Sequence, residues 1–135
     1  MLNAEPDFAV YLTFNGNCRE AFLYYQNCFG GDLQVQTLAD TPDGKAMSSG
    51  MQSLVIYASL TSQKFKLVGT DLSDDGRLVT GNRLSILLYC DSFAERARLI
   101  NKLVNRNFCS YENYHPLVNV TDRFSVNWVL SVRLK

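Results

Sequence analysis

The spacing of apolar and polar residues divides the first half of the chain into alternating strands and a helix. "FAVYLTF" at 8–14 is apolar on both sides, whereas "DLQVQTL" at 32–38 alternates with the period of two that predicts a strand. Two further strand-like runs, "SLVIYASL" and "KFKLVGT", follow around a short turn. Between the first two strands, "NGNCREAFLYYQNCFGG" at 15–31 carries apolar residues at spacings of three and four, which predicts a helix with one packing face.

This predicted helix has recognisable ends. Asn17 with Glu20 three residues later resembles a capping box, and Gly30 and Gly31 offer a left-handed stop. The apolar stripe comprises Cys18, Ala21, Phe22, Tyr25, Cys28 and Phe29. We therefore expect the segment to pack against a sheet, with its cysteines as small apolar fillers rather than as a redox or metal site.

The same order of patterns recurs in the second half of the chain. "RLSILLY" at 83–89 precedes a helix that is opened by Ser92 with Glu95 three residues later, and "FCSYENY", "PLVNVTD" and "SVNWVLSV" follow as strands. The chain is therefore expected to be one α+β domain of two βαβββ modules, 7–70 and 83–133. The polar segment 71–82 would link the two modules. A long loop at 40–52 with a Pro-Asp-Gly turn signal belongs to the first module alone.

Length, charge and composition exclude several classes of protein. At 135 residues with 13 basic and 13 acidic side chains, the chain has no basic patch of the kind that tracks phosphates. No apolar run reaches a membrane span, and the first residues lack the pattern of a secretory signal. We expect a cytoplasmic protein without a nucleic-acid or membrane partner. The four cysteines form no C-x-x-C pair and the single histidine has no companion, which argues against a zinc cluster.

The duplicated modules resemble the vicinal oxygen chelate superfamily of glyoxalases, extradiol dioxygenases and bleomycin-resistance proteins. Within that superfamily, the PhnB-like branch is the most similar. The resemblance rests on "YLTFNGNCREAFLYYQNCFGG", on "YASL" at 57–60 and on "TDRFSVNW" at 121–128, where Ser125 replaces a glycine of the branch. It implies that the two modules form a cupped mixed sheet with the helices outside, and that the protein is a homodimer.

Metalloenzymes of this superfamily place one metal ligand on each of four strands facing the cup. The resemblance carries those positions to Val10, Tyr57, Ser85 and Val129. Valine offers no donor to a divalent cation, and tyrosine and serine are poor donors at neutral pH, so we expect no metal and no cofactor.

Strand alternation predicts which side chains line this cup. Residues on the core side would be Leu54, Ile56, Ala58 and Leu60, then Leu84, Ile86 and Leu88, then Val126, Trp128 and Leu130. By the same alternation, Val55 would face the cup. The first strand, 8–14, is apolar on both faces, so alternation does not show which of its residues face the cup. The predicted cup-lining set is Val10, Leu12, Tyr57, Ser59, Ser85, Leu87, Tyr89, Asn127 and Val129, with His115 near the rim.

Tyr57 is the strongest candidate for a functional side chain, because its hydroxyl could donate to a carbonyl or carboxylate of a ligand; otherwise it fills the cup. Some PhnB-like sequences carry the label of demethylubiquinone methyltransferase. This chain has no glycine-rich turn after a strand for a nucleotide-like cofactor, so we set that activity aside.

Three hypotheses follow, and whether the protein is an enzyme stays open. The leading one is a metal-free protein that binds a small, mostly apolar organic molecule in the cup. The second is a lyase, isomerase or dioxygenase with substitute metal ligands, or a metal-free enzyme that uses Tyr57 or His115. The third is a structural or regulatory dimer whose cup is collapsed.

Overall fold

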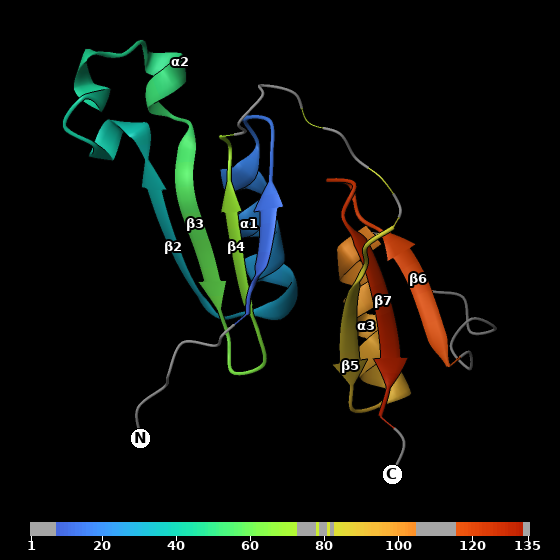
Figure 1. The fold of residues 1–135 in the computed structure, drawn as a ribbon. Helices are drawn as coiled ribbons and strands as arrows, with labels where there is room; N and C mark the ends of the chain where they lie inside the picture. The colour runs from blue at the N-terminus through green and yellow to red at the C-terminus, as the bar shows by residue number, and fades with distance from the viewer. Residues whose placement is uncertain (1–7, 73–77, 79–80, 82, 105–115, 134–135) are drawn as a thin grey trace. The chain divides into compact units, whose positions relative to one another are not determined.

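The chain folds into two units, each with a helix across one face of a sheet (Figure 1). The computed structural model describes residues 8–72, 78, 81, 83–104 and 116–133. Contacts divide the chain into Met1–Leu78 and Val79–Lys135. Both sheets are mixed, and the fold is α+β with βαβββ-like modules, so the predicted fold class is confirmed.

The first unit follows the predicted order of strands and helix. Its elements are β1 (Val10–Thr13), α1 (Cys18–Phe29), β2 (Asp32–Thr37), β3 (Val55–Thr61) and β4 (Lys66–Thr70). The strands lie in the order β1-β4-β3-β2, with β1 parallel to β4 and the other neighbours antiparallel. The first and last strands of the unit are therefore neighbours.

Helix α1 packs through the apolar stripe that its spacing predicts. Cys18, Ala21, Phe22, Tyr25 and Cys28 are buried. The Phe22 ring lies edge-on to Phe14 and to Tyr25, with ring centroids 6.0 Å apart in each pair. Burying one such aromatic ring contributes about 1.5–3 kcal/mol, so this stripe is a large part of what holds the unit together.

The start of α1 differs from the predicted capping box, because Asn17 makes no side-chain cap. Asp71, which directly follows β4, takes that role instead. Its Oδ1 accepts from the backbone N–H of Gly16 (2.9 Å) and of Cys18 (3.0 Å), and its Oδ2 accepts from that of Val55 (2.9 Å). A carboxylate at a helix N-terminus is also favoured by the helix dipole. Asp71 thus joins the beginnings of α1 and β3 to the end of β4.

The loop between β2 and β3 folds into three short helical turns, η1 (Leu38–Asp40), η2 (Gly44–Ala46) and α2 (Ser49–Gln52). Its ends meet where Leu38 N–H donates to Leu54 O at 3.0 Å. The Gln52 side chain donates to Gly44 O at 3.0 Å and so ties α2 to η2. The insertion predicted at 40–52 is therefore a compact loop closed on itself.

The second unit repeats this plan in the residues that the structure describes. Its elements are β5 (Ile86–Cys90), α3 (Phe93–Val104), β6 (Leu117–Thr121) and β7 (Asn127–Val132). The strand order is β5-β7-β6, with β5 parallel to β7 and β6 antiparallel to it. Strand β5 begins three residues later than the predicted 83–89, and the predicted strand "FCSYENY" lies outside the described residues.

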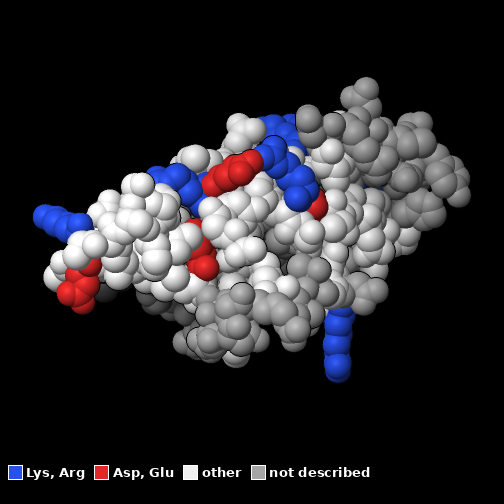
Figure 2. Space-filling model, turned by 90° about the horizontal axis from the view of Figure 1, so that it is seen from above, with Lys and Arg blue, Asp and Glu red and all other residues white. Residues whose placement is uncertain are grey.

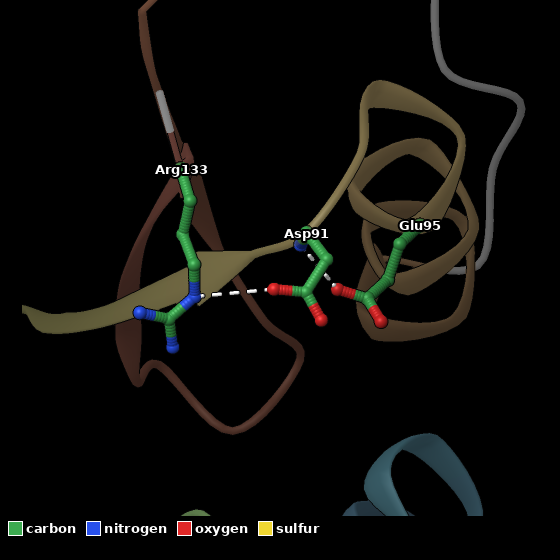
Figure 3. Close-up of polar contacts among 3 residues, drawn as sticks. All are labelled: Asp91, Glu95 and Arg133. Atoms are coloured by element: carbon green, nitrogen blue, oxygen red, sulfur yellow. Dashed lines mark hydrogen bonds and ion pairs between the residues drawn. The ribbon is translucent and has the colours of Figure 1, made fainter. Parts of the chain in front are cut away.

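Helix α3 begins as its sequence predicts. The Ser92 hydroxyl accepts from the Glu95 N–H at 3.0 Å, while the Glu95 carboxylate accepts from the Asp91 N–H at 2.8 Å (Figure 3). Its buried residues are Arg96, Ile100 and Leu103. The Arg96 side chain donates to the backbone oxygens of Pro116 (3.2 Å) and Leu130 (3.4 Å), which ties the helix to the sheet below it.

The turn between β6 and β7 is organised by Asp122. Its carboxylate accepts from the indole N–H of Trp128 (2.8 Å) and from the backbone N–H groups of Phe124 (2.8 Å) and Val126 (3.1 Å). Ser125 has a φ of 69°, a left-handed conformation that favours glycine. Ser125 therefore holds a conformation that glycine, the residue of the PhnB-like pattern at this position, adopts more easily. Trp128 is buried, as predicted for a core residue.

Candidate functional site

The strand register of the first sheet shows which residues face α1. A Cβ added to Gly69 would collide with Cε1 of Phe22, so Gly69 lies directly against the helix. Gly69 pairs with Ala58 and with Leu12, and Leu67 pairs with Leu60 and with Val10. Because paired residues point to the same side of a sheet, all of these residues lie on the helix-covered face.

The opposite face carries the polar and phenolic side chains. Tyr57 pairs with Gln36, and Ser59 pairs with both Gln34 and Val68. On β1, Tyr11 pairs with Val68 and Thr13 with Thr70. We call this surface the tyrosine face; it comprises Tyr11, Thr13, Gln34, Gln36, Tyr57, Ser59, Val68 and Thr70. Tyr57 is 39% exposed and Tyr11 63% exposed, whereas Ser59 is buried.

Two residues predicted to line the cup do not belong to the tyrosine face. Val10 and Leu12 lie on the helix-covered face, on the same side of the sheet as Leu67 and Gly69. The neighbouring residues Tyr11 and Thr13 take their place beside Tyr57. Sequence reasoning missed Tyr11 because β1 is apolar at both parities, and only its pairing with β4 fixes which parity faces the helix.

A register shift in β3 corrects the expected position of Val55. Gln36 pairs with Tyr57 but Thr37 pairs with Val55, so Ile56 is an extra residue on β3. Val55 is completely buried rather than facing a cup. Its N–H donates to Asp71 and its carbonyl accepts from the Asp71 N–H at 2.8 Å. The strand that carries Tyr57 is thus fixed at the residue where it begins.

The second sheet also has a helix-covered face and a more exposed face. Trp128 and Leu130 are buried and pair with Ile86 and Leu88. On the other side, Leu87 pairs with Val129 and Tyr89 with Ser131. Leu87 is 45% exposed and Tyr89 52% exposed. The alternation predicted for Leu87, Tyr89 and Val129 matches this register.

The remaining predicted site residues have other surroundings. Ser85 precedes β5 and is exposed. The Asn127 amide donates to Gly81 O (3.0 Å) and Leu84 O (3.4 Å) and accepts from the Thr121 hydroxyl (2.8 Å). Asn127 therefore serves to hold the chain that leads into β5. His115 lies outside the described residues.

Tyr89 lies beside an exposed ion pair. Arg133 Nε lies 3.2 Å from Asp91 Oδ1, and its guanidinium lies 5.2 Å from the centre of the Tyr89 ring. The Arg133 and Asp91 side chains are more than half exposed, so this ion pair contributes less than about 1 kcal/mol. On the face shown in Figure 2, basic side chains likewise lie next to acidic ones.

The thiol of Cys18 is chemically quiet. Burial, together with the nearby Asp71 carboxylate, raises the pKa of Cys18 from 9.0 to about 12. The reactive form of a cysteine is its thiolate. Because that form is suppressed at neutral pH, the stripe cysteine at the start of α1 is a packing residue, as its spacing predicts.

The residues at the superfamily's metal positions do not fit a divalent cation. Val10 and Val129 offer only carbon, and Val10 also faces α1. Tyr57 and Ser85 supply a phenol and a hydroxyl, which are weak ligands when protonated. Within the described ranges, no three His, Cys, Asp or Glu side chains gather to hold a metal ion. We derive no chemistry through a metal at these positions.

Solved structures of other proteins share this fold over almost the whole chain. A PhnB protein from Bacillus cereus, described as a 3-demethylubiquinone-9 3-methyltransferase, is 18% identical and matches with a TM-score of 0.68 over 95% of this chain and 100% of its own. The chain therefore shares the fold of this PhnB protein. The PhnB-like resemblance is thereby confirmed at the level of fold.

Other matches extend this finding. Protein PA1353 from Pseudomonas aeruginosa is 26% identical with a TM-score of 0.72, over 97% of this chain and 100% of its own. A gene product from Arabidopsis thaliana is 18% identical with a TM-score of 0.57, over 95% of this chain and 99% of its own. No protein-family model and no curated protein sequence matches the chain. Among the described residues, no helix is long and apolar enough to cross a membrane.

Proposed function

We propose that this glyoxalase-like protein binds a small, mostly apolar organic molecule without the help of a metal ion. The observation that carries the proposal is the position of Tyr57. Its phenol is partly exposed on the tyrosine face, on a strand whose start is fixed by Asp71. A ligand with an apolar body and one carbonyl or carboxylate would use the ring for contact and the hydroxyl for orientation.

The neighbours of Tyr57 support this role. Gln36 lies opposite it and Gln34 lies opposite Ser59, so amide and hydroxyl groups surround the phenol on one face. These groups can both donate and accept hydrogen bonds, which suits recognition of a neutral polar group. They are poor nucleophiles and bases at neutral pH, so the set favours binding over catalysis.

A thermal-shift screen of small organic compounds tests the proposal. A compound present at 100 times its dissociation constant adds about 2.7 kcal/mol of stability, which is easily measured. Tyr57→Phe then removes only the hydroxyl. A lost hydrogen bond to a neutral group of about 0.5–1.5 kcal/mol predicts binding roughly 2- to 12-fold weaker.

Two further variants make the result specific. Tyr24→Phe removes a hydroxyl from helix α1, away from the tyrosine face, and is expected to leave binding unchanged. Leu87→Trp enlarges a side chain on the exposed face of the second sheet. If hits respond to Leu87→Trp or Tyr24→Phe but are indifferent to Tyr57→Phe, Tyr57 does not orient the ligand.

About one equivalent of Zn, Ni, Fe or Mn in protein purified without metal-affinity capture would contradict metal-free binding.

We further propose that the protein is a cytoplasmic homodimer. The support is the resemblance in sequence to the PhnB-like branch. Light scattering coupled to size-exclusion chromatography measures the mass directly. A mass of one chain, 15.3 kDa, across the working range of concentrations would contradict the dimer.

A further inference from the structure

The pair Asn15–Gly16, between β1 and α1, combines features that favour a reaction of the chain with itself. Asn15 is exposed, and Gly16 has a φ of +94° with no atom within 4 Å of the place where a side chain would begin. An asparagine followed by glycine is the sequence in which the next backbone nitrogen reaches the side-chain amide carbon with least hindrance, because glycine has no Cβ.

That backbone nitrogen is held by another part of the unit. The Gly16 N–H donates to Asp71 Oδ1 at 2.9 Å, and the same oxygen accepts from the Cys18 N–H at 3.0 Å. On the other side of the pair, the Phe14 N–H donates to Thr70 O at 2.8 Å. The Asn15–Gly16 peptide is therefore anchored before and after by the end of β4.

We propose that Asn15 is a site of spontaneous deamidation, and that Asp71 sets its rate by holding the Gly16 N–H. In the reaction, the Gly16 nitrogen loses its proton and bonds to Cγ of Asn15. The Cγ–Nδ2 bond breaks, and the amide leaves as ammonia with that proton. Water then adds to one of the two carbonyls of the succinimide ring, which gives aspartate or isoaspartate.

Asp71 opposes the first step in two ways. The Gly16 nitrogen attacks only after it gives up its proton, and a carboxylate that accepts this proton in a hydrogen bond would face a second negative charge if the proton left. The hydrogen bond also fixes the plane of the Asn15–Gly16 peptide, so the nitrogen cannot turn towards Cγ. Folded protein with Asp71 in place is therefore protected, and loss of that contact exposes the site.

The modified product would change the first unit. Isoaspartate adds one main-chain carbon at the point where the chain turns into α1, and either product brings a carboxylate to position 15, near Asp71. Asp71 also holds the first amides of α1 and β3. Repulsion between its carboxylate and one at position 15 would therefore loosen α1, β3 and the end of β4 together. Deamidated Asn15 would therefore accumulate with time in molecules whose first unit has opened.

Peptide mapping by mass spectrometry after prolonged incubation in mildly alkaline buffer tests the proposal on the full chain. Asp71→Asn removes the negative charge from the acceptor. We expect Asn15 to deamidate about tenfold faster in this variant than in the wild type, a change of about 1.4 kcal/mol in the barrier. Asn27, inside α1, provides an internal reference in the same digest.

Leu60→Ala is the matched control, because it opens a cavity in the same unit without altering the acceptor of the Gly16 N–H. We expect this variant to deamidate at Asn15 far more slowly than Asp71→Asn. Equal rates in the two variants, or no acceleration by Asp71→Asn, would overturn the proposal. If Asp71→Asn does not fold, hydrogen exchange of the wild-type Gly16 amide decides: an unprotected amide refutes the role of Asp71, and a protected one supports it.

Discussion

The contact between Gly69 and α1 makes a sharp prediction about stability. Alanine at this position would drive its Cβ into Cε1 of Phe22, and would place it 2.8 Å from Cζ of that ring and 3.1 Å from Sγ of Cys18. The Phe22 ring has little room to move, because it lies between Phe14 and Tyr25. Overpacking of a filled core costs about 1–3 kcal/mol, and we expect Gly69→Ala to lie in the upper half of that range.

Urea unfolding followed by far-ultraviolet circular dichroism measures this change across the helices and strands of both units. Trp128 fluorescence reports the second unit separately, because this single tryptophan lies on β7. Gly50→Ala is the matched control, since its Cβ would meet nothing within 4 Å. It should be neutral or stabilise α2 by up to about 1 kcal/mol through helix propensity.

A double-mutant cycle identifies the collision as the cause. Phe22→Leu removes the ring atoms that a Cβ at position 69 would strike, so the two changes together should cost at least about 0.5 kcal/mol less than the sum of the single variants. Strict additivity, or a Gly69→Ala protein as stable as the wild type, would show that α1 does not pack on β4 at this point.

Three further predictions concern stability and thiol chemistry. Asp122→Ala removes the carboxylate that accepts from the buried Trp128 indole N–H and from two backbone amides. The variant should lose about 2–4 kcal/mol of unfolding free energy in urea. A loss below about 1 kcal/mol would contradict the organising role of Asp122. Ser125→Gly relieves a left-handed serine at the cost of chain entropy and should raise the free energy of unfolding by roughly 0.5 kcal/mol, whereas a loss would refute the strain. Native Cys18 should resist thiol reagents near pH 8. Rapid labelling of the folded protein would contradict this prediction. Because the pKa of Cys18 is higher in the folded than in the unfolded protein, the contribution of the buried thiol to stability is complete below pH 9.0 and declines as pH rises towards about 12.

Much of the architecture could be predicted because its determinants are local. The apolar stripe at spacings of three and four indicates α1, and Ser92 and Glu95 mark the start of α3. The alternation from Tyr57 to Leu60 and from Ile86 to Tyr89 agrees with the observed register. In each case, the side chains that carry the signal also make the contact, so the pattern and the structure have one physical origin.

The features that were missed depend on residues far apart in the chain. Asn17 has the sequence pattern of a cap for α1, but Asp71 fills the site from the far end of the unit. Val10 and Tyr11 are both apolar enough to be buried, so only pairing with β4 could show which one faces the helix. No pattern in the sequence indicates the extra residue at Ile56, which places Val55 in the core.

The pairing of each unit's first strand with its last has a consequence for synthesis on the ribosome. Strand β1 cannot find its neighbour until β4 has emerged, so the closing step of the first unit joins residues that are distant in the chain and carries a large loop-closure entropy. Once Asp71 has left the exit tunnel, however, every residue needed for that closure is present. The first unit can therefore complete its sheet while β5–β7 are still being translated, which spares it from pairing with the similar strands of the second.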